Sequence, residues 1–416
     1  MAEISRRVAL SLLFAAPVVL VSCSVADRAS ARPSPSPTPT PTKAASAGMP
    51  ASLSKAALPQ GPLAAAPFGP TGSHWPTRTP RPSDSFDLVV EAECTWQDIS
   101  RSISYVAERT PHGKGCVLVK PGVLPGYGAG SSKPPVLQRI GALGRDHRVL
   151  VMPREGSASI TFSDSIRLDA VKGVAFAGFW LFPQSIVLTS VQDFAWAWSK
   201  GQAFNITAGA SGPASQIELV ECVTPEAKLT DADVWAIRTG DNSWNDIQIV
   251  GCYLAPSYKS ATSAAHCDTL QLSGSSPGAD LVIRDTVIFA STNSGFIPSD
   301  RTSGIVFDHS LVVGGDRMVV RYPLPAGANA FASGKPAAVN GIGTVDAISA
   351  ASSTFVGNLR GQWLSVQNCI ASIPRPPAVS SGQFSVDLSL NAVGADWLDA
   401  RAPLPTDEAL RLAWSL

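Results

Sequence analysis

The spacing of apolar residues changes once along this chain. In "TWQDISRSISYVAERTPHG", residues 95–113, apolar side chains recur at the period of one helix face, at Trp96, Ile99, Ile103 and Val106. Thr95, followed three residues later by Asp98, forms a helix-capping pattern. After this segment, "GCVLVKPGVLPGYG" predicts a strand closed by a Pro-Gly turn, and short β-rich runs broken by Gly, Ser, Asp and Asn follow. The pattern therefore predicts one amphipathic helix followed by many strands.

Five of these runs form a weak internal repeat: "IELVECVTP", "IQIVGCYLA", "LVIRDTVIF", "IVFDHSLVV" and "LSVQNCIAS". Each has aliphatic residues at alternate positions and then a small or thiol residue, and these aligned residues are Cys222, Cys252, Thr286, Ser310 and Cys369. The first three steps between them are 30, 34 and 24 residues, a range typical of solenoids. Because one coil cannot bury its apolar face alone, we expect stacked coils with a shared core. We predict that the aligned cysteines are buried small side chains rather than metal ligands or catalytic thiols.

The helix that leads into "VLVKPG", followed by irregularly long coils, resembles the right-handed parallel β-helix of the pectate-lyase-like superfamily over about residues 86–390. Polysaccharide lyases, glycoside hydrolases, phage tailspikes and non-enzymatic surface proteins share this pattern. The resemblance implies an all-β, single-stranded, right-handed parallel β-helix with an N-terminal capping α-helix. We expect the C-terminal "DWLDARAPLPTDEALRLAWSL" to cover the other end of a domain spanning residues 84–416.

The N-terminal residues 1–22 have the composition of an export signal, with Arg6 and Arg7 before the apolar run "VALSLLFAAPVVLV". The following "LVSC" resembles the bacterial lipobox, which implies cleavage before Cys23, its acylation, and a tether on the outer face of the bacterial cell membrane. A plain secretory signal is the alternative. The Pro-rich "RPSPSPTPTPTK" then predicts an extended stalk over residues 23–83.

The charge of the chain limits the classes of partner, and its cysteines raise the question of disulfides. The chain has 32 basic and 32 acidic residues and no basic run after the stalk, which argues against nucleic acid as a partner. Six cysteines follow Cys23, and in an exported chain they allow 15 pairings. Because Cys94 and Cys116 flank the predicted helix, we predict that they form a disulfide. The sequence does not set the oligomeric state.

The segment "SAAHCDTLQLSG", residues 263–274, holds the densest group of polar chemistry. His266, Asp268 and Gln271 are similar to a His-x-Asp-Gly-x-Gln motif of exported bacterial β-helix proteins assigned to polysaccharide processing, with Thr269 in place of the glycine. In a strand, His266 and Asp268 would project to one face and Gln271 to the other. The same residues are equally compatible with the start of a strand, where polar side chains satisfy turn backbone groups.

The residues near this motif are compatible with two reactions that cleave polysaccharides. β-Elimination needs a cation beside a uronate carboxylate, for which the candidates are Arg238, Arg301, Arg317 and Arg321, and a base such as His266 or Lys259. Three aspartates, Asp241, Asp268 and Asp300, recur near strand ends. Together they are candidates to hold calcium, or two of them to form the acid and base pair of a glycosidase.

Tryptophans form the last group of candidates. Five tryptophans precede the motif, and they either stack on sugars or pack against long loops. They are Trp180, Trp196, Trp198, Trp235 and Trp244. We name Trp235 and Trp244, with Gln271 and Lys259, as candidate substrate-binding residues. The one Gly-x-Ser-x-Gly match, at residues 274–278, lacks the alternation of strands and helices that a serine-hydrolase elbow needs, and the sequence has no phosphate-binding glycine loop.

The leading hypothesis is a lipid-anchored surface protein that binds or cleaves a polysaccharide. A lyase would gather Arg, Lys and His on one face, whereas a glycoside hydrolase would gather carboxylates. The alternative is a non-catalytic adhesive or structural module.

Overall fold

Parallel strands make up most of the computed structural model, which describes residues 67–416 apart from 131, 299–300, 330–335, 342–347 and 415–416. The chain divides into Met1–Ala56 and Ala57–Leu416, and the fold given below is that of the second unit. The predicted signal peptide, the lipidation site Cys23 and the stalk up to residue 66 lie outside the described residues.

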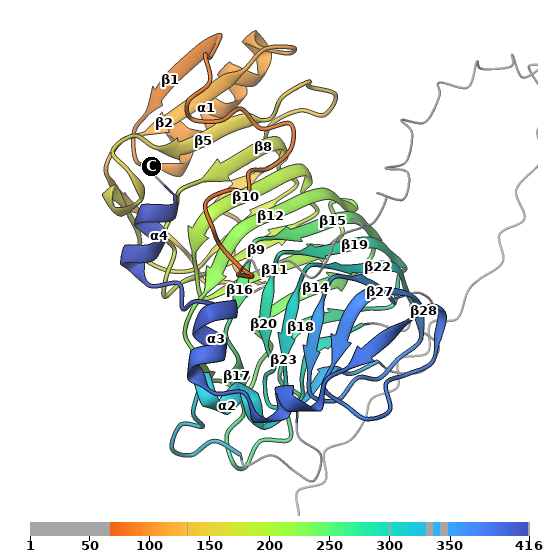
Figure 1. Ribbon diagram of the computed structural model, residues 1–416. Coiled ribbons are helices and arrows are strands. Elements are labelled where there is room, and N and C mark those ends of the chain that lie inside the picture. The colour runs from red at the N-terminus through yellow and green to blue at the C-terminus, as the bar shows by residue number, and fades with distance from the viewer. Residues whose placement is uncertain (1–66, 131, 299–300, 330–335, 342–347, 415–416) are drawn as a thin grey trace, which may run out of the picture. The chain divides into compact units, whose positions relative to one another are not determined.

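Three groups of strands run along the molecule (Figure 1). The main sheet consists of β1 (Leu88–Ala92), β2 (Gly115–Val119), β5 (Val149–Pro153), β8 (Lys172–Ala177), β10 (Gln192–Lys200), β12 (Ala214–Thr224), β15 (Trp244–Val250), β19 (Gly278–Arg284), β22 (Thr302–Asp308), β25 (Ile348–Ala351), β27 (Trp363–Ala371) and β28 (Val379–Val386). The side row consists of β16 (Tyr253–Leu254), β20 (Val287–Phe289), β23 (Leu311–Val313) and β26 (Thr354–Val356). The back sheet consists of β4 (Leu137–Gln138), β7 (Ile166–Asp169), β9 (Ser185–Thr189), β11 (Ala203–Ala208), β14 (Trp235–Thr239), β18 (Asp268–Ser273), β21 (Ser294–Ile297) and β24 (Ala337–Val339).

The remaining elements are short. β3 (Gly122–Leu124) pairs with β6 (Ile160–Phe162), and β13 (Lys228–Leu229) pairs with β17 (Ser257–Tyr258). The helices are α1 (Trp96–Arg109), α2 (Met318–Arg321), α3 (Ala395–Arg401) and α4 (Asp407–Ala413), with 3-10 turns at Ser157–Ser159, Gly315–Arg317 and Leu388–Ala392. Within the described part of the chain, no helix is long and apolar enough to cross a membrane.

Each coil passes from the back sheet to the main sheet, then to the side row, and the next coil stacks on it in parallel. For example, β18, β19 and β20 pair with β21, β22 and β23 of the next coil. Aliphatic residues such as Leu270 and Leu281 point inward and share one continuous interior cluster. The predicted all-β stack of parallel coils is confirmed.

The N-terminal helix forms where the apolar spacing predicts it. The N-cap residue Thr95 accepts a hydrogen bond from the Asp98 N–H at 3.2 Å. The buried face of α1, which is Trp96, Ile99, Ile103 and Val106, joins the same interior cluster as the strands. The helix packs against β1, β2 and β5 and so covers the first coils (Figure 1).

The aligned small residues form a hydrogen-bonded ladder at the bend between the main sheet and the side row. The Cys222 N–H donates to Cys252 Sγ at 3.3 Å, and the Cys252 N–H donates to Thr286 Oγ1 at 3.2 Å. The ladder continues through Ser310 to Ser353, and from there to Cys369. All six side chains are buried, which confirms the predicted interior stack. Ser353 was missed because its run, "ISAASSTFV", contains neither a thiol nor a strict alternation of aliphatic residues.

The predicted disulfide between Cys94 and Cys116 is wrong, since both cysteines are free. Cys116 lies in β2, where its side chain is buried in an outer cluster with Leu150. Cys94 follows β1 and packs against the interior cluster instead. The two side chains therefore contact different sides of the main sheet.

The C-terminal segment does not cover the end of the stack, contrary to prediction. Helices α3 and α4 lie along its flank (Figure 1), where Leu398 and Leu410 pack in one cluster with Tyr253 of the side row. Lys200 pairs with Asp407 at 2.7 Å. The outer side of the side row is apolar, so it provides a binding surface for these helices that the end of the stack lacks.

The predicted stalk extends too far. Residues 67–83, which we call the strap, lie against the outer side of the main sheet. Phe68 is buried, and the Phe68 N–H donates to the Arg401 carbonyl at 2.7 Å. Thr77 donates through both its N–H and its hydroxyl to Glu218 at 2.8 Å. Proline content alone therefore did not separate a spacer from an ordered segment.

Candidate functional site

Asp268 lies at the first position of β18 and is fully buried, on the inward side that it shares with Leu270. One carboxylate oxygen accepts hydrogen bonds from the hydroxyl of Ser294 and, at 2.8 Å, from the amide of Asn293. The other oxygen, Oδ2, is buried and has no partner among the described residues. Burial raises the pKa of Asp268 to about 6, although the two hydrogen bonds act in the opposite direction.

A second carboxylate, which sequence reasoning missed, links Asp268 to Arg238. Asp233 Oδ1 accepts the Asp268 N–H at 3.0 Å, and its Oδ2 lies 3.4 Å from Arg238 Nη2. Burial raises the pKa of Asp233, while the hydrogen bond from Asp268 and the charge of Arg238 oppose the rise. The strand register locates it: Trp235 pairs with Leu270, which puts Asp233 level with Asp268, and the sequence repeat does not give this register.

His266 is exposed two residues before β18. A positive charge on His266 would oppose the rise in the pKa of Asp233 and Asp268. No hydrogen bond joins His266 to Asp268 among the described contacts. His266 and Asp268 thus lie at the same bend of the coil, but they do not form the direct pair that a strand geometry predicts.

Lys259 and Asp231 complete the same corner of the coil, where the side row leads into the back sheet. The Lys259 N–H donates to Thr292 Oγ1 at 3.0 Å. Asp231 accepts the Ser260 N–H at 2.9 Å, which, with the charge of Lys259, lowers its pKa. We call Asp231, Asp233, Arg238, Lys259, His266 and Asp268 the corner cluster.

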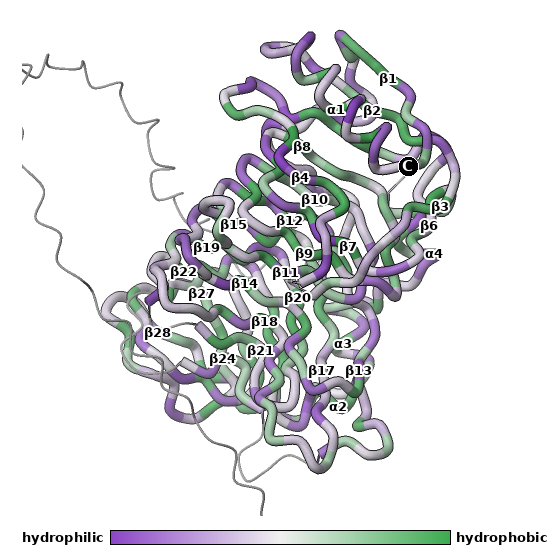
Figure 2. The backbone as a smooth tube through the Cα atoms, turned by 180° about the vertical axis from the view of Figure 1, so that it is seen from behind, coloured by the Kyte–Doolittle hydropathy of each residue, from purple (hydrophilic) through white to green (hydrophobic). Residues whose placement is uncertain are grey.

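The outer face of the back sheet extends from the corner cluster as a polar surface. Thr189, Thr207, Arg238 and Ser273 are partners in register on successive strands, and all are half-buried. Gln271 points outward beside them, level with Ala236. Neighbouring strands in a sheet lie about 4.8 Å apart, so these polar groups repeat at that interval along the solenoid. Figure 2 shows β9, β11, β14 and β18 following one another in this sheet.

Arg301 and Asp241 lie away from the corner cluster. Arg301 Nη1 donates to the Ser275 carbonyl at 2.6 Å, just beyond the far end of β18. Since β18 has six residues, His266 and Arg301 are separated by about 20 Å or more. Asp241 is exposed after the same end of β14, and Asp300 lies outside the described residues.

The described residues do not assemble the predicted calcium site. No three His, Cys, Asp or Glu side chains in the described ranges gather closely enough to hold a metal ion. Asp241 and Asp268 stand at opposite ends of neighbouring strands, so they cannot share one cation or form a glycosidase acid and base pair. Calcium binding therefore stays a prediction that depends on residues such as Asp300.

Trp235 and Trp244 cannot bind substrate as predicted, because both indoles are buried in the core. Trp235 Nε1 donates to Thr224 Oγ1 at 2.9 Å, and its ring lies 5.0 Å from that of Phe204. Trp244 lies so close to Gly278 that a Cβ there would be 2.2 Å from the indole. The solenoid interior is thus wide enough to take tryptophans, which the sequence analysis did not anticipate.

Comparison with known proteins gives limited information. No family model matches the chain, and no curated protein matches it in sequence. Among solved structures, the chain is similar to ORF18 of Geobacillus virus E2, with 10% identity over 71% of this chain and 61% of that one, and a TM-score of 0.34. It is also similar to the catalytic domain of a GH87 alpha-1,3-glucanase in complex with nigerose, with 11% identity over 72% and 59% of the two chains and a TM-score of 0.31.

A third similar structure is the A-module of the mannuronan C-5 epimerase AlgE4 from Azotobacter vinelandii, at 10% identity over 72% of this chain and 100% of that one, with a TM-score of 0.29. The chain spans about three-fifths of the first two structures in this comparison, which are the viral protein and a GH87 glucanase domain. At these TM-scores we draw no functional argument from the likeness.

Proposed function

We propose that this protein is a right-handed β-helix that binds a polysaccharide along the outer face of the back sheet and the adjoining corner cluster. The observation that carries the proposal is the register-matched row of half-buried polar side chains, Thr189, Thr207, Arg238 and Ser273. Its repeat suits a ligand that is itself an extended chain of similar units, because each coil offers the same kind of contact to the next unit.

The distribution of charge in the corner cluster favours binding or acid-assisted hydrolysis over β-elimination. Arg238 is paired with Asp233, and Arg301 lies at the far end of β18, so these two predicted cations do not converge on one ligand group. The carboxylates Asp231, Asp233 and Asp268 gather instead. A raised pKa is what a general acid requires.

Glycoside hydrolysis is therefore the second candidate, with Asp233 as the proton donor. Asp233 keeps a tenth of its side chain exposed, whereas Asp268 is buried and would act by positioning Asp233 through its N–H. A non-catalytic surface module is the outcome if no glycan is cleaved.

The test is a glycan-binding panel with the full chain, followed by measurement of released reducing ends and of the ultraviolet absorbance of unsaturated uronates. Wild type should retain a glycan that Arg238→Ala and Gln271→Ala retain less, while Arg139→Ala, an exposed arginine of the early coils, serves as the control. Reducing ends that appear without the absorbance of unsaturated uronates, and that disappear in Asp233→Asn, would establish hydrolysis. Absence of any glycan binding would refute the proposal.

We further propose that Cys23 carries a lipid anchor that holds the protein at the outer face of the bacterial membrane. The support is the sequence alone, namely the apolar run that ends in "LVSC". Detergent-phase partition of the mature protein, lost in Cys23→Ser, is the expected result. An unchanged partition would favour the plain secretory signal.

A further inference from the structure

The corner that carries the corner cluster continues, coil by coil, toward the C-terminal end of the stack. The Asn293 N–H donates to the Cys267 carbonyl at 2.9 Å, and the Ala337 N–H donates to the Asn293 carbonyl at 3.1 Å. The Ala338 N–H then donates to the Asn358 carbonyl at 2.9 Å. These are three coil steps, so Asn358 lies about 15 Å along the solenoid from the corner cluster.

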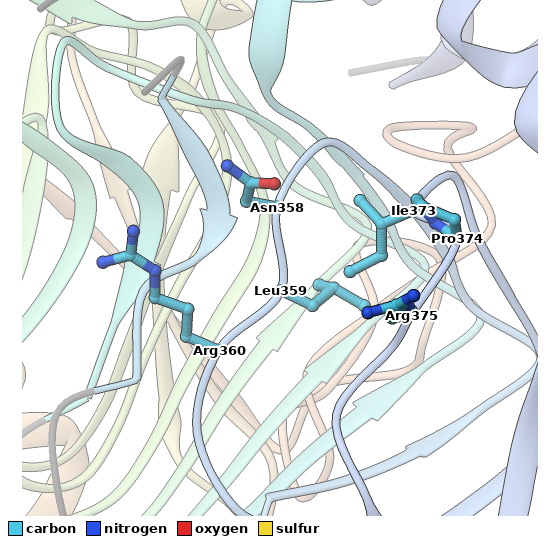
Figure 3. A pocket seen from close by; sticks show the side chains of 6 residues that line it. All are labelled: Asn358, Leu359, Arg360, Ile373, Pro374 and Arg375. Carbon is cyan, nitrogen blue, oxygen red and sulfur yellow. The ribbon is translucent and has the colours of Figure 1, made fainter. Parts of the chain in front are cut away.

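Two adjoining depressions open at this place, with volumes of about 340 and 380 Å³. They share Asn358, Ile373 and Pro374 as lining residues. Figure 3 shows the first of them, with Arg360 and Arg375 projecting from two different segments of backbone on either side of Leu359. The second depression is lined by Arg317 and by glycines of the turns after β23 and β26.

The absence of side chains at these turns keeps the second depression open. A Cβ on Gly357, whose φ is +99°, would lie 3.0 Å from the backbone of Gly314 and Gly315. Any larger residue would therefore both strain the turn and push the two backbone segments apart. The sequence uses glycine where the two segments approach each other most closely.

The depressions are lined mainly by arginines, whereas the corner cluster mixes carboxylates with basic side chains. Arg317, Arg360 and Arg375 line them, and Asp316 is the acidic residue among the described lining residues. Arg360 donates to Asn340 Oδ1 at 3.3 Å, and Arg317 Nη1 donates to the Val393 carbonyl at 3.1 Å. Arg317 Nε is buried and has no hydrogen-bond partner among the described residues. Guanidinium groups bind carboxylates and sulfates through paired N–H donors, so the three arginines suit an anion.

We propose that these depressions, which we call the arginine pocket, bind the anionic substituent of a polysaccharide, a carboxylate or a sulfate, whose chain lies along the corner. This inference rests on the proposed function, because it assumes that the ligand is a glycan on the same face. The apolar walls formed by Leu359, Ile373 and Pro374 suit the C–H face of a sugar ring, and the arginines suit its anionic group.

The difference in charge also bears on how such a chain is placed. The arginine pocket attracts an anionic group, whereas in the corner cluster the attraction of Arg238 and Lys259 is offset by the carboxylates beside them. A regularly charged glycan therefore gains most when its anionic units lie over the later coils. A glycan without charge gains no charge-assisted contact from the arginine pocket.

The experiment compares matched ligands on the full chain by calorimetry: oligogalacturonate, its methyl ester, a sulfated oligosaccharide with a neutral backbone, and inorganic sulfate as competitor. Wild type should bind an anionic oligosaccharide roughly tenfold or more tightly than the ester, and salt should reduce the difference. Arg360→Gln with Arg375→Gln should abolish the difference and leave the affinity for the ester unchanged. Arg139→Gln, which removes an exposed arginine elsewhere, should keep it.

The outcomes separate the inference from the proposed function. Equal affinity for the ester and both charged ligands, or a preference that survives the double arginine change, overturns the arginine pocket but leaves glycan binding intact. A preference for only one charged ligand identifies carboxylate or sulfate as the group that is recognised. Failure of wild type to bind any of the oligosaccharides overturns both. Because both arginines are exposed, near-identical thermal unfolding of the double variant is the check on its fold.

Discussion

Two regions of this molecule bury carboxylates at bends of the solenoid, and the two differ in how completely the carboxylate oxygens are hydrogen-bonded. Near the strap, Glu221 is fully buried yet accepts hydrogen bonds from the N–H groups of Thr71, Gly72 and His74, and from Trp414 Nε1 at 2.6 Å. In the corner cluster, Asp268 is equally buried but leaves one oxygen without a partner among the described residues. The first arrangement stabilises a charge and the second disfavours it.

The pKa values follow the same division. Asp285, which contacts the strap through His74 at 3.1 Å, is half-buried; burial acts to raise its pKa, but hydrogen bonds from His309 and His74 lower the pKa to about 2. Asp268 has only neutral donors, so burial dominates and its pKa rises to about 6. Satisfied buried charges usually serve stability, whereas incompletely satisfied ones are more often found where a protein acts on a ligand. The comparison therefore treats Glu221 as a structural carboxylate of the strap and Asp268 as the candidate for a functional role.

The largest expected effect comes from removing a charge on the strap side. Arg148, almost fully buried, donates to Asp193 at 2.9 Å and to Glu218 at 2.5 Å. Arg148→Met removes the buried charge between the two carboxylates, leaving Asp193 with Arg78 and Glu218 with the neutral donors of Thr77, and should lower the free energy of unfolding by about 3 to 5 kcal/mol. Denaturant titration measures this loss. Arg154→Met, which removes an exposed arginine paired with Glu91, is the matched control and should cost far less. Similar losses in the two variants would contradict the comparison.

His74 makes the strap sensitive to pH. Burial acts to lower its pKa, but hydrogen bonds to Asp285 and Glu221 outweigh burial and raise the pKa to about 9 from 6.5. The stabilisation is thus complete below 6.5 and is lost as pH rises through about 9. Asp285, with its lowered pKa, contributes above its ordinary value and loses its contribution as pH falls toward 2.

We expect His74→Gln to be less stable than wild type by about 2 kcal/mol near neutral pH, because two charge-assisted hydrogen bonds become neutral ones. The difference between the proteins should shrink in alkaline buffer. A difference that stays constant from neutral to alkaline pH would show that His74 acts by shape alone.

The structure also explains why the strap escaped prediction. Gly251 occupies the bend position between Glu221 and Asp285, and a Cβ there would be 2.5 Å from His74 Nδ1. The glycine makes room for a histidine that lies far away in sequence, in a segment that looks like a linker. Periodicity describes contacts between neighbouring coils, whereas this contact depends on a distant segment, which no local pattern encodes.

In the corner cluster, removing the carboxylate charge should raise the free energy of unfolding rather than lower it. The raised pKa of Asp268 means that ionisation in the folded state costs stability as pH rises from its ordinary value through about 6. Asp268→Asn can still accept from Ser294 and Asn293, so above that range it should be as stable as wild type or more stable, by about 1 to 3 kcal/mol. Unfolding at acidic and neutral pH tests this, since the advantage should vanish in acid. A large loss of stability at neutral pH would place Asp268 with the strap carboxylates.

The corner cluster also shows which parts of a site a sequence motif can predict. The segment around His266 is correctly located as the start of a strand, and its polar residues do gather at one corner. Asp233 was overlooked because it lies one coil earlier, 35 residues away. Trp235 and Trp244 were misassigned because their burial depends on how much space the interior provides. To find residues that come together from different coils, one must know the strand register. The weak repeat gives this register only for the main sheet.

The smallest expected effect concerns the ladder of small side chains directly beside the strap carboxylates, where Glu221 precedes Cys222 and Asp285 precedes Thr286. In this ladder Cys252 Sγ accepts the Cys222 N–H at 3.3 Å. Serine already holds the equivalent place at Ser310 and Ser353, so Cys252→Ser should change stability by less than about 1 kcal/mol. Cys252→Val keeps the volume but leaves the buried N–H unpaired, and should cost about 1 to 3 kcal/mol. Thermal unfolding of the two variants separates the explanations: if valine is tolerated as well as serine, packing alone holds this bend, and the polar ladder adds nothing to the stability of the strap beside it.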